Sequence, residues 1–319
     1  MDFVFLISGL LLLAISGDAL VRGAISAADR MHIPPIITGL TIVAFGTSAP
    51  ELIVSIEAAM KGAPGLALGN VIGSNVANTL LVLGAPAIIA PIIISEGGMR
   101  RSSVFLITMS FILLALIFDG NVSQFDGLLL FTLLVVYLTY SGIEAMKSRK
   151  ETLQNGNLKE ADDGADKPLT TMWIVGFIGL GIIGLGIGGK LTIAGAIDIA
   201  ARFNVADTAV GLSIVALGTS LPELAASISA ALRKQAGMMI GNVIGSSIFN
   251  ILGIIGITAM IIPLAVPKTI ISFDIWVMIG VFLLLIPTAY ITRKIGRVQG
   301  WLMTLAYLAY ILMVFRTAS

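Results

Sequence analysis

The sequence of 319 residues contains no cysteine and one histidine, His32. The lack of cysteine excludes disulfides, thiolate metal sites and cysteine nucleophiles, and one histidine excludes metal centres with several imidazole ligands. Charged residues make up 12% of the chain and the net charge is +1, whereas soluble domains carry roughly 25% charged residues. This balance leaves no electrostatic footprint for nucleic acid, so we expect no nucleic-acid partner.

Apolar residues, in contrast, make up 57% of the chain, and the mean hydropathy is +1.02. Such a composition cannot cover a water-facing surface, which argues against a soluble enzyme and predicts a polytopic, all-α membrane protein. Runs of about 20 apolar residues, the length that crosses ~30 Å of hydrocarbon, predict ten transmembrane helices: 3–28, 36–60, 66–92, 102–118, 125–145, 171–201, 208–232, 238–263, 273–291 and 297–315. The first run has no basic leader or cleavage site, so it is interpreted as a retained helix.

The loop charges predict the orientation. Ten spans place both termini on one side of the membrane, and termini outside put most of the 19 Lys and Arg residues in cytoplasmic segments, as the positive-inside rule requires. Residues 146–170 are charged and poor in apolar residues, so they are predicted to be a flexible cytoplasmic linker. It separates two predicted five-helix halves, 1–145 and 171–319. We expect an integral protein of the cell membrane.

The two halves repeat each other at a constant offset of 172 residues. GLTIVAFGTSAPELIVS at 39–55 recurs as GLSIVALGTSLPELAAS at 211–227, and GNVIGSNVAN at 69–78 recurs as GNVIGSSIFN at 241–250. Because each half has an odd number of spans, the second half enters the membrane from the opposite side. Inverted repeats of this kind are typical of secondary transporters with a site at the midplane, although a channel can share them.

Each repeat contains a glutamate in mid-span, Glu51 or Glu223, directly after a proline. An ionisable group at that depth costs at least ~2.5–3.5 kcal/mol on insertion scales, so it needs a cation, a proton or a basic side chain beside it. No Lys or Arg lies at that depth in the repeated segments. Pro50 and Pro222 lack an amide donor and free the carbonyl four residues back, which is tolerated where the backbone lines a cavity. We therefore expect a cation or proton site on two broken helices.

Further oxygen donors accompany the glutamates in the repeated segments, and the threonine and serine before each glutamate share its helix face. A threonine and a serine lie four and three residues before each glutamate, and the GNVIGS segments add serines and asparagines: Thr47, Ser48, Thr219, Ser220, Asn70, Ser74, Asn78, Asn242, Ser246 and Asn250. Hard oxygen ligands suit Ca²⁺ and Na⁺ and disfavour zinc, copper and iron. For any single asparagine or serine among them, hydrogen bonding between helices is an equally good interpretation.

The paired G-T-S-x-P-E and G-N-x-I-G-S segments resemble the alpha repeats of the Ca²⁺/cation antiporter superfamily, most closely its prokaryotic Na⁺/Ca²⁺ exchanger branch. The resemblance covers essentially the whole chain. It implies two inverted halves of five helices, with the long first and sixth helices sliding as gates. By position it assigns ion ligation to Glu51, Glu223, Thr47, Ser48, Thr219, Ser220, Ser74, Ser246, Asn78, Asn250 and the carbonyls of Ala44 and Ala216.

The predicted function is antiport of Ca²⁺ for Na⁺ by alternating access, in a chain that is not an enzyme. Asn250 stands where the resemblance places an aspartate in K⁺-dependent exchangers, and the G-N-x-x-E pattern of the proton-coupled branch is absent. Exchange of H⁺ for Ca²⁺, K⁺-dependent exchange and, in another class, a cation channel are the alternatives. We expect no cofactor besides the transported ions, and no obligatory protein partner besides the lipid bilayer.

Two charges on the predicted first and sixth helices stand at equivalent repeat positions, Asp18 and Lys190. Inversion of the repeats places them toward opposite membrane faces, so a direct salt bridge between them is not expected. We interpret both as helix-end or snorkelling residues.

Overall fold

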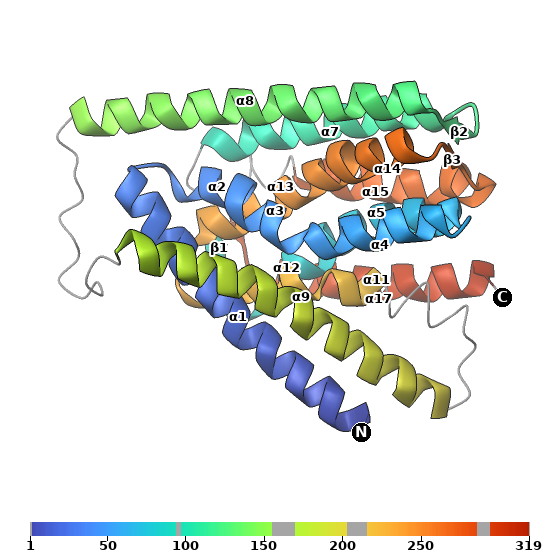
Figure 1. Cartoon of the computed structure of the whole chain (residues 1–319), viewed down its shortest axis with the longest axis horizontal. Helices are drawn as coiled ribbons and strands as arrows, with labels where there is room; N and C mark the ends of the chain where they lie inside the picture. Colours follow the sequence, from blue (N-terminus) through green and yellow to red (C-terminus); the bar gives the residue numbers. More distant parts are fainter. Residues whose placement is uncertain (1, 94–96, 155–169, 203–215, 286–293, 319) are drawn as a thin grey trace.

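The computed structural model describes residues 2–93, 97–154, 170–202, 216–285 and 294–318, which are helical almost throughout (Figure 1). The first part of the chain forms α1 (Asp2–Met31), α2 (Pro35–Thr38), η1 (Gly39–Val43), α3 (Ala44–Thr47), α4 (Ala49–Met60), α5 (Pro64–Ala77), η2 (Asn78–Val82), α6 (Gly84–Ile89), β1 (Ile92–Ile93), α7 (Gly97–Ile117), β2 (Asn121–Val122) and α8 (Gln124–Gln154). The elements marked η are π-helical turns.

The described elements of the second part of the chain follow a similar order, with an additional π-helical turn, η5, before α15. This part forms α9 (Thr171–Arg202), α11 (Ala216–Thr219), α12 (Leu221–Leu232), α13 (Ala236–Phe249), η4 (Asn250–Ile255), α14 (Gly256–Ile261), β3 (Leu264–Ala265), η5 (Ile270–Asp274), α15 (Ile275–Leu283), β4 (Lys294–Ile295) and α17 (Arg297–Ala318).

The described helices confirm an all-helical membrane protein. Seven are long and apolar enough to cross a membrane, and the bent pair Pro35–Thr47 and Ala49–Met60 makes an eighth. The other two predicted spans, 208–232 and 273–291, correspond to shorter apolar helices, Leu221–Leu232 and Ile270–Leu283. Residues 208–215 and 286–291 of these spans lie outside the described residues.

The end of α8 differs from the predicted boundary. The helix continues to Gln154, past residue 146, where the polar linker is predicted to begin. Its last turns carry the charged sequence KSRKE, which is compatible with a helix because Lys, Arg and Glu are good helix formers. The rest of the predicted linker, 155–169, lies outside the described residues.

The long helices α1 and α9 lie side by side and cross the remaining helices at an angle (Figure 1). Small residues allow their backbones to approach closely: a Cβ added to Gly188 would lie 3.0 Å from the amide nitrogen of Leu13. A comparable approach joins η1 to α13, where a Cβ on Gly241 would lie 2.9 Å from the amide nitrogen of Leu40. Glycine at these positions brings helices of the two halves into backbone contact.

Two short antiparallel strand pairs, which an all-α prediction does not include, also join the halves. Strand β1 pairs with β4, and β2 pairs with β3. One strand of each pair, β1 or β3, directly follows a proline at the end of a helix. The residues before these prolines are extended: Ala90 has φ −133° and ψ 121°, and Ile262 has φ −142° and ψ 124°. The residue before a proline is driven into this extended conformation, so the chain leaves each helix as a strand.

Candidate ion-binding site

Both glutamates lie at a break in a helix. α3 ends at Thr47, Ser48 has φ −84° and ψ 4°, and α4 departs at an angle of 43°. The second half repeats this conformation, because α11 ends at Thr219 and Ser220 has φ −84° and ψ 0°. The prolines enter the first turn of α4 and α12, where the missing amide hydrogen is not needed. Glu51 and Glu223 therefore each occupy the first turn of a helix, whose positive end favours a carboxylate.

The two carboxyl groups are fully buried, with 0% of either residue exposed. Within the described part of the chain, both carboxyl oxygens of Glu51 and the Oε2 atom of Glu223 have no hydrogen-bond partner. Burial of ionised groups without a partner is very unfavourable, so these oxygens require a cation or a proton.

The remaining oxygen of Glu223 is held by the other half. The Oγ atom of Ser48 donates to Oε1 of Glu223 across 2.8 Å. Ser48 is the residue at the break before α4, so the break in the first half positions the carboxylate of the second.

Two further hydrogen bonds cross between the halves at equivalent repeat positions. The Oγ1 atom of Thr47 donates to Oδ1 of Asn242 across 3.3 Å, and Oγ1 of Thr219 donates to Oδ1 of Asn70 across 3.1 Å. All four side chains are buried. Because the two bonds are interchanged by the repeat offset, the halves meet at the site in a two-fold arrangement.

The same asparagines also brace the broken helices of their own halves. The Nδ2 atom of Asn70 donates to Oγ of Ser55 across 3.1 Å and to the Glu51 carbonyl across 3.5 Å. In the second half, Nδ2 of Asn242 donates to Oγ of Ser227 across 3.1 Å and to the Glu223 carbonyl across 3.4 Å. The sequence indicates Asn70 and Asn242 as oxygen donors for an ion, but in this conformation they hold the backbone that carries the glutamates.

Three other predicted ligands, Ala44, Ser74 and Ser246, take part in hydrogen bonds. The carbonyl of Ala44 accepts from the Ser48 amide at 3.0 Å, from Oγ1 of Thr47 at 3.3 Å and from Oγ of Ser246 at 3.4 Å. The Oγ atom of Ser74 donates to the Asn70 carbonyl across 2.7 Å. Ser246 thus reaches the broken helix of the first half, whereas Ser74 stays within its own helix.

Ala216 and Ser220 complete the predicted set in the second half. Ala216 is the first residue of α11, and the residues before it lie outside the described chain. Ser220 is buried at the break, like Ser48. The two breaks therefore present equivalent residues from opposite halves.

Asn78 and Asn250 begin the π-helical turns η2 and η4. Such turns within helices often mark functional sites. Both side chains are buried. In the described chain, the Oδ1 and Nδ2 atoms of Asn78 and the Oδ1 atom of Asn250 have no hydrogen-bond partner. With the glutamates they make five buried, unpartnered oxygens: Oε1 and Oε2 of Glu51, Oε2 of Glu223, and Oδ1 of Asn78 and Asn250.

The donor set has the chemistry of a hard cation site. Two carboxylates and neutral oxygens match Ca²⁺ or Na⁺. Among the described residues, no three His, Cys, Asp or Glu side chains gather as a transition-metal centre would require. The residues that sequence reasoning missed are Ser55, Ser227 and Asn75, and the first two carry a signal, because each follows its glutamate by four residues.

Comparison with known proteins identifies the family. The sequence profile described as sodium/calcium exchanger protein matches residues 1–142 and 173–316. The chain belongs to this family. It is 36% identical to the putative antiporter CaxA of Alkalimonas amylolytica, over 98% of each chain, and 31% identical to the inner membrane protein YrbG of Escherichia coli, over 97% of this chain and 95% of that protein.

A solved structure of the sodium-calcium exchanger NCX_Mj, soaked with Na⁺ and Ca²⁺, has the same fold. Its TM-score is 0.81 at 31% identity, and the match covers 98% of this chain and 97% of the other. The chain is therefore an integral membrane protein and a transporter of the cation exchanger family, not an enzyme. Its relatives at this level of identity include membrane proteins of prokaryotes.

Proposed function

We propose that this chain exchanges Ca²⁺ for Na⁺ across the cell membrane by alternating access. The observation that carries the proposal is a set of five buried oxygens that have no hydrogen-bond partner among the described residues, and this set includes atoms of both carboxylates and comes from both halves. Family membership and the fold shared with NCX_Mj support the same function.

The proposed architecture is ten transmembrane helices in two inverted halves, 1–145 and 171–319, with a cytoplasmic linker at 146–170 and both termini outside. The distribution of Lys and Arg supports the orientation. The paired hydrogen bonds of Thr47 with Asn242 and of Thr219 with Asn70 support the inverted repeat, because the offset of 172 interchanges them. The two strand pairs support it as well, since each joins one half to the other.

In the proposed mechanism Glu51 and Glu223 bind either one Ca²⁺ or Na⁺ ions. Two carboxylates neutralise one Ca²⁺, and Ca²⁺ takes 6 to 8 oxygen ligands. Neutral ligands would come from Thr47, Ser48, Ser74, Asn78, Ala44 and from their counterparts Thr219, Ser220, Ser246, Asn250 and Ala216. Because both ions need the same carboxylates, they compete for the site, and release of one to a given side follows the binding of the other.

The first test is ⁴⁵Ca²⁺ uptake into proteoliposomes. We expect uptake when the vesicles contain Na⁺ and no uptake when choline replaces it. Uptake driven by a proton gradient but not by Na⁺ would instead assign the chain to H⁺/Ca²⁺ exchange, and stimulation by internal K⁺ would indicate K⁺-dependent exchange. Calcium flux without any counter-ion would overturn exchange in favour of a channel.

A further inference from the structure

Asn75, on α5, holds the side chain of Asn250. Both residues are 0% exposed, and Oδ1 of Asn75 accepts a hydrogen bond from Nδ2 of Asn250 across 3.3 Å. The Nδ2 atom of Asn75 lies 3.5 Å from the sulfur of Met278 on α15, a weak acceptor. That contact directs the Asn75 oxygen toward Asn250. The bond connects the first half of the chain to the start of η4 in the second.

The orientation of the Asn250 amide follows from this bond. An asparagine side chain has an NH₂ group that donates and an oxygen that accepts, and the NH₂ group of Asn250 donates to Asn75. Its Oδ1 atom therefore points away from Asn75, where it is buried without a hydrogen-bond partner among the described residues. Asn250 shares a helix face with Ser246, whose hydroxyl reaches the Ala44 carbonyl at the break. A flipped amide would place two N–H donors on that face and repel a cation.

The repeat shows that this support belongs to one half. The counterpart of Asn250 is Asn78, and the counterpart of Asn75 is Ser247. Within the described chain, neither the Ser247 hydroxyl nor either amide atom of Asn78 has a hydrogen-bond partner. The two repeats have therefore diverged at the position that holds Asn250, directly after the six identical residues GNVIGS.

We propose that Asn75 is a positioning residue that fixes the Asn250 amide with its oxygen toward the transported cation. The proposal rests on the proposed function, because it concerns the affinity of the same site. Asn75 acts through Asn250 and does not itself bind the ion.

The test compares Ca²⁺ binding and transport in three variants. Asn75→Leu removes the acceptor at similar size, and we expect the Ca²⁺ Kd and the transport KM to rise about 10-fold or more, as for other groups that orient a metal ligand, with kcat little changed. Ser247→Ala is the matched control and should leave Kd unchanged. Asn250→Asp added to Asn75→Leu should restore affinity, because a carboxylate presents an oxygen on either edge.

The outcomes separate this proposal from the proposed function. An unchanged Kd in Asn75→Leu, beside normal binding by the unmodified protein, overturns the positioning role alone. A raised Kd that Asn250→Asp does not restore indicates a packing defect and overturns it too. Absence of Ca²⁺ binding by the unmodified protein overturns the proposed function and this role together.

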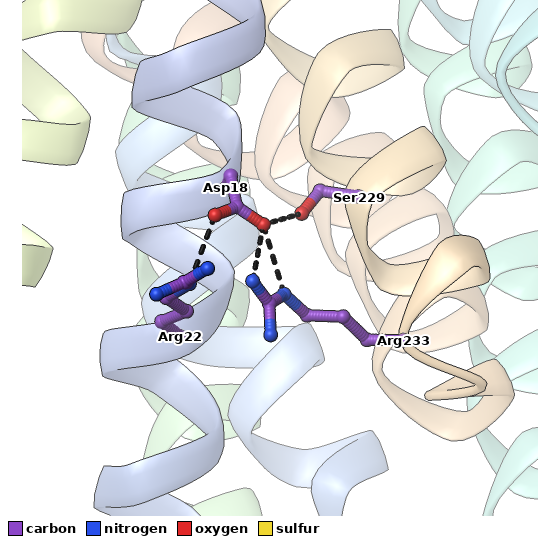
Figure 2. A network of polar contacts seen from close by, with 4 residues as sticks. All are labelled: Asp18, Arg22, Ser229 and Arg233. Carbon is purple, nitrogen blue, oxygen red and sulfur yellow. Dashed lines mark hydrogen bonds and ion pairs between the residues drawn. The ribbon is translucent and has the colours of Figure 1, made fainter. Parts of the chain in front are cut away.

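A second, independent observation concerns Asp18, which ties α1 to α12 (Figure 2). Its Oδ1 atom accepts from Nε and Nη2 of Arg233 at 2.9 and 2.5 Å and from Oγ of Ser229 at 3.1 Å, and its Oδ2 atom pairs with Nε of Arg22 at 2.9 Å. The interpretation of Asp18 as a snorkelling residue is therefore incomplete. Arg233 is the residue at the C-terminal end of α12, the helix that carries Glu223 in its first turn.

The repeat places a complementary pair on the opposite side. The offset of 172 relates Asp18 to Lys190 on α9, Ser229 to Glu57 on α4, and Arg233 to Lys61. Lys190 is exposed, and the carboxylate of Glu57 pairs with Lys61 on its own helix at 3.1 Å. Helix α1 packs along α12, whereas α9 makes no comparable contact with α4 among the described residues. Asp18 and Lys190 thus stand at equivalent positions and carry opposite charges, but in the described chain only Asp18 lies in a contact between its long helix and the helix that carries a glutamate.

We infer that the two ion pairs alternate with the access state. Transporters with inverted repeats change state when one half rocks against the other, and the halves then exchange arrangements. The pair of Asp18 with Arg233 is closed here. In the opposite state it opens, α9 packs against α4, and Lys190 pairs with Glu57. In the proposed topology these pairs lie toward opposite membrane faces, so each holds one access state.

Cysteine cross-linking tests the alternation, since the natural chain has no cysteine. We expect the two cysteine pairs to cross-link under opposite ion conditions: Asp18→Cys/Arg233→Cys and Glu57→Cys/Lys190→Cys. The yield of each cross-link should fall under the conditions that favour the other. Cross-linking of the Glu57→Cys/Lys190→Cys pair under none of the conditions that support transport would overturn the inference, as would cross-linking of both pairs that rises and falls together.

Charge variants provide a second measurement. Asp18→Asn should change the ratio of the two access states roughly two- to fivefold, the range for a partly exposed ion pair. Lys190→Gln should change this ratio in the opposite direction. Glu144→Gln, which breaks the exposed pair of Glu144 with Arg101 within one half, is the control and should shift neither. Shifts in the same direction for Asp18→Asn and Lys190→Gln would contradict alternation.

Discussion

Ser48 donates a hydrogen bond of 2.8 Å to Glu223, so a residue at the helix break of one half holds the carboxylate of the other. Ser48→Ala removes this donor, so that all four carboxyl oxygens of the pair lack a hydrogen-bond partner among the described residues. We expect the Ca²⁺ Kd to rise roughly 10- to 100-fold, because a hydrogen bond to a charged group contributes about 1.5–3 kcal/mol and each 1.4 kcal/mol is about tenfold in Kd. Thr139→Val, on the exposed face of α8, is the control. Equal affinities of the two variants in equilibrium ⁴⁵Ca²⁺ binding would refute this positioning by Ser48.

The carboxylates themselves give the sharpest prediction. Glu51→Gln and Glu223→Gln keep the shape of each side chain but remove its charge, so each should abolish Ca²⁺ exchange in proteoliposomes. The free protein should unfold at the same temperature or higher, because a buried charge without a partner is removed. Glu144→Gln should transport normally. Robust exchange by either site variant would show that the ions bind elsewhere.

Calcium should stabilise the folded protein measurably. A ligand that binds only the folded state adds about 2.7 kcal/mol to stability at 100 times its Kd. Thermal unfolding in detergent should therefore occur at a higher temperature in Ca²⁺ than in chelator, with Na⁺ as a second stabilising ion. The same scans of Glu51→Gln should show no Ca²⁺ effect. A Ca²⁺ shift of the same size in that variant would assign the stabilisation to another site.

Two glycines at equivalent repeat positions should differ in their tolerance of a side chain. A Cβ on Gly241 would lie 2.9 Å from the Leu40 amide and 3.1 Å from the Gly39 Cα atom, whereas a Cβ on Gly69 would have no neighbour within 4 Å. Gly241→Ala should destabilise the protein by about 1–3 kcal/mol through overpacking. Gly69→Ala should be neutral or stabilising by up to ~1 kcal/mol, the difference in helix propensity. Similar unfolding temperatures for the two variants would contradict the close contact of η1 with α13.

The proposed orientation can be tested with single cysteines. Asn157→Cys lies in the predicted linker and Ser319→Cys at the C-terminus. A membrane-impermeant maleimide applied to intact cells should label Ser319→Cys, and should label Asn157→Cys only after the membrane is opened. The reverse pattern would invert the topology while leaving the repeat intact.

The sequence predicted the elements of the fold well where the signal is local. Helix breaks at Pro50 and Pro222 follow from the chemistry of proline, and both are present. The strand pairs were not predicted, because a two-residue strand has no periodicity to detect. The end of α8 at Gln154 was missed as well, since the polarity of the segment argued for a loop while its helix propensity favoured continuation.

The candidate site residues were predicted from the repetition of the sequence, whereas their hydrogen-bond partners were not predicted. Thr47 and Asn242 each stand out in a repeated motif, but their hydrogen bond joins residues 195 positions apart. The same holds for Asp18 and Arg233, 215 positions apart. Nothing in the local pattern of either residue specifies such a partner, which depends on how the helices pack.

The sequence by itself determined that this is an integral membrane protein, that its two halves contain repeated segments, and that each half carries one buried glutamate on a broken helix. These properties follow from hydropathy, residue order and the covalent chemistry of proline, all of which act locally. Only the tertiary structure decided that the break of one half holds the carboxylate of the other, and that Asn75 holds Asn250 while its counterpart Ser247 has no such bond within the described chain. It also decided that Asp18 of α1 forms an ion pair with Arg233 at the end of α12. The physical reason is that two similar motifs in one chain pack in a single arrangement, and that arrangement gives them different neighbours.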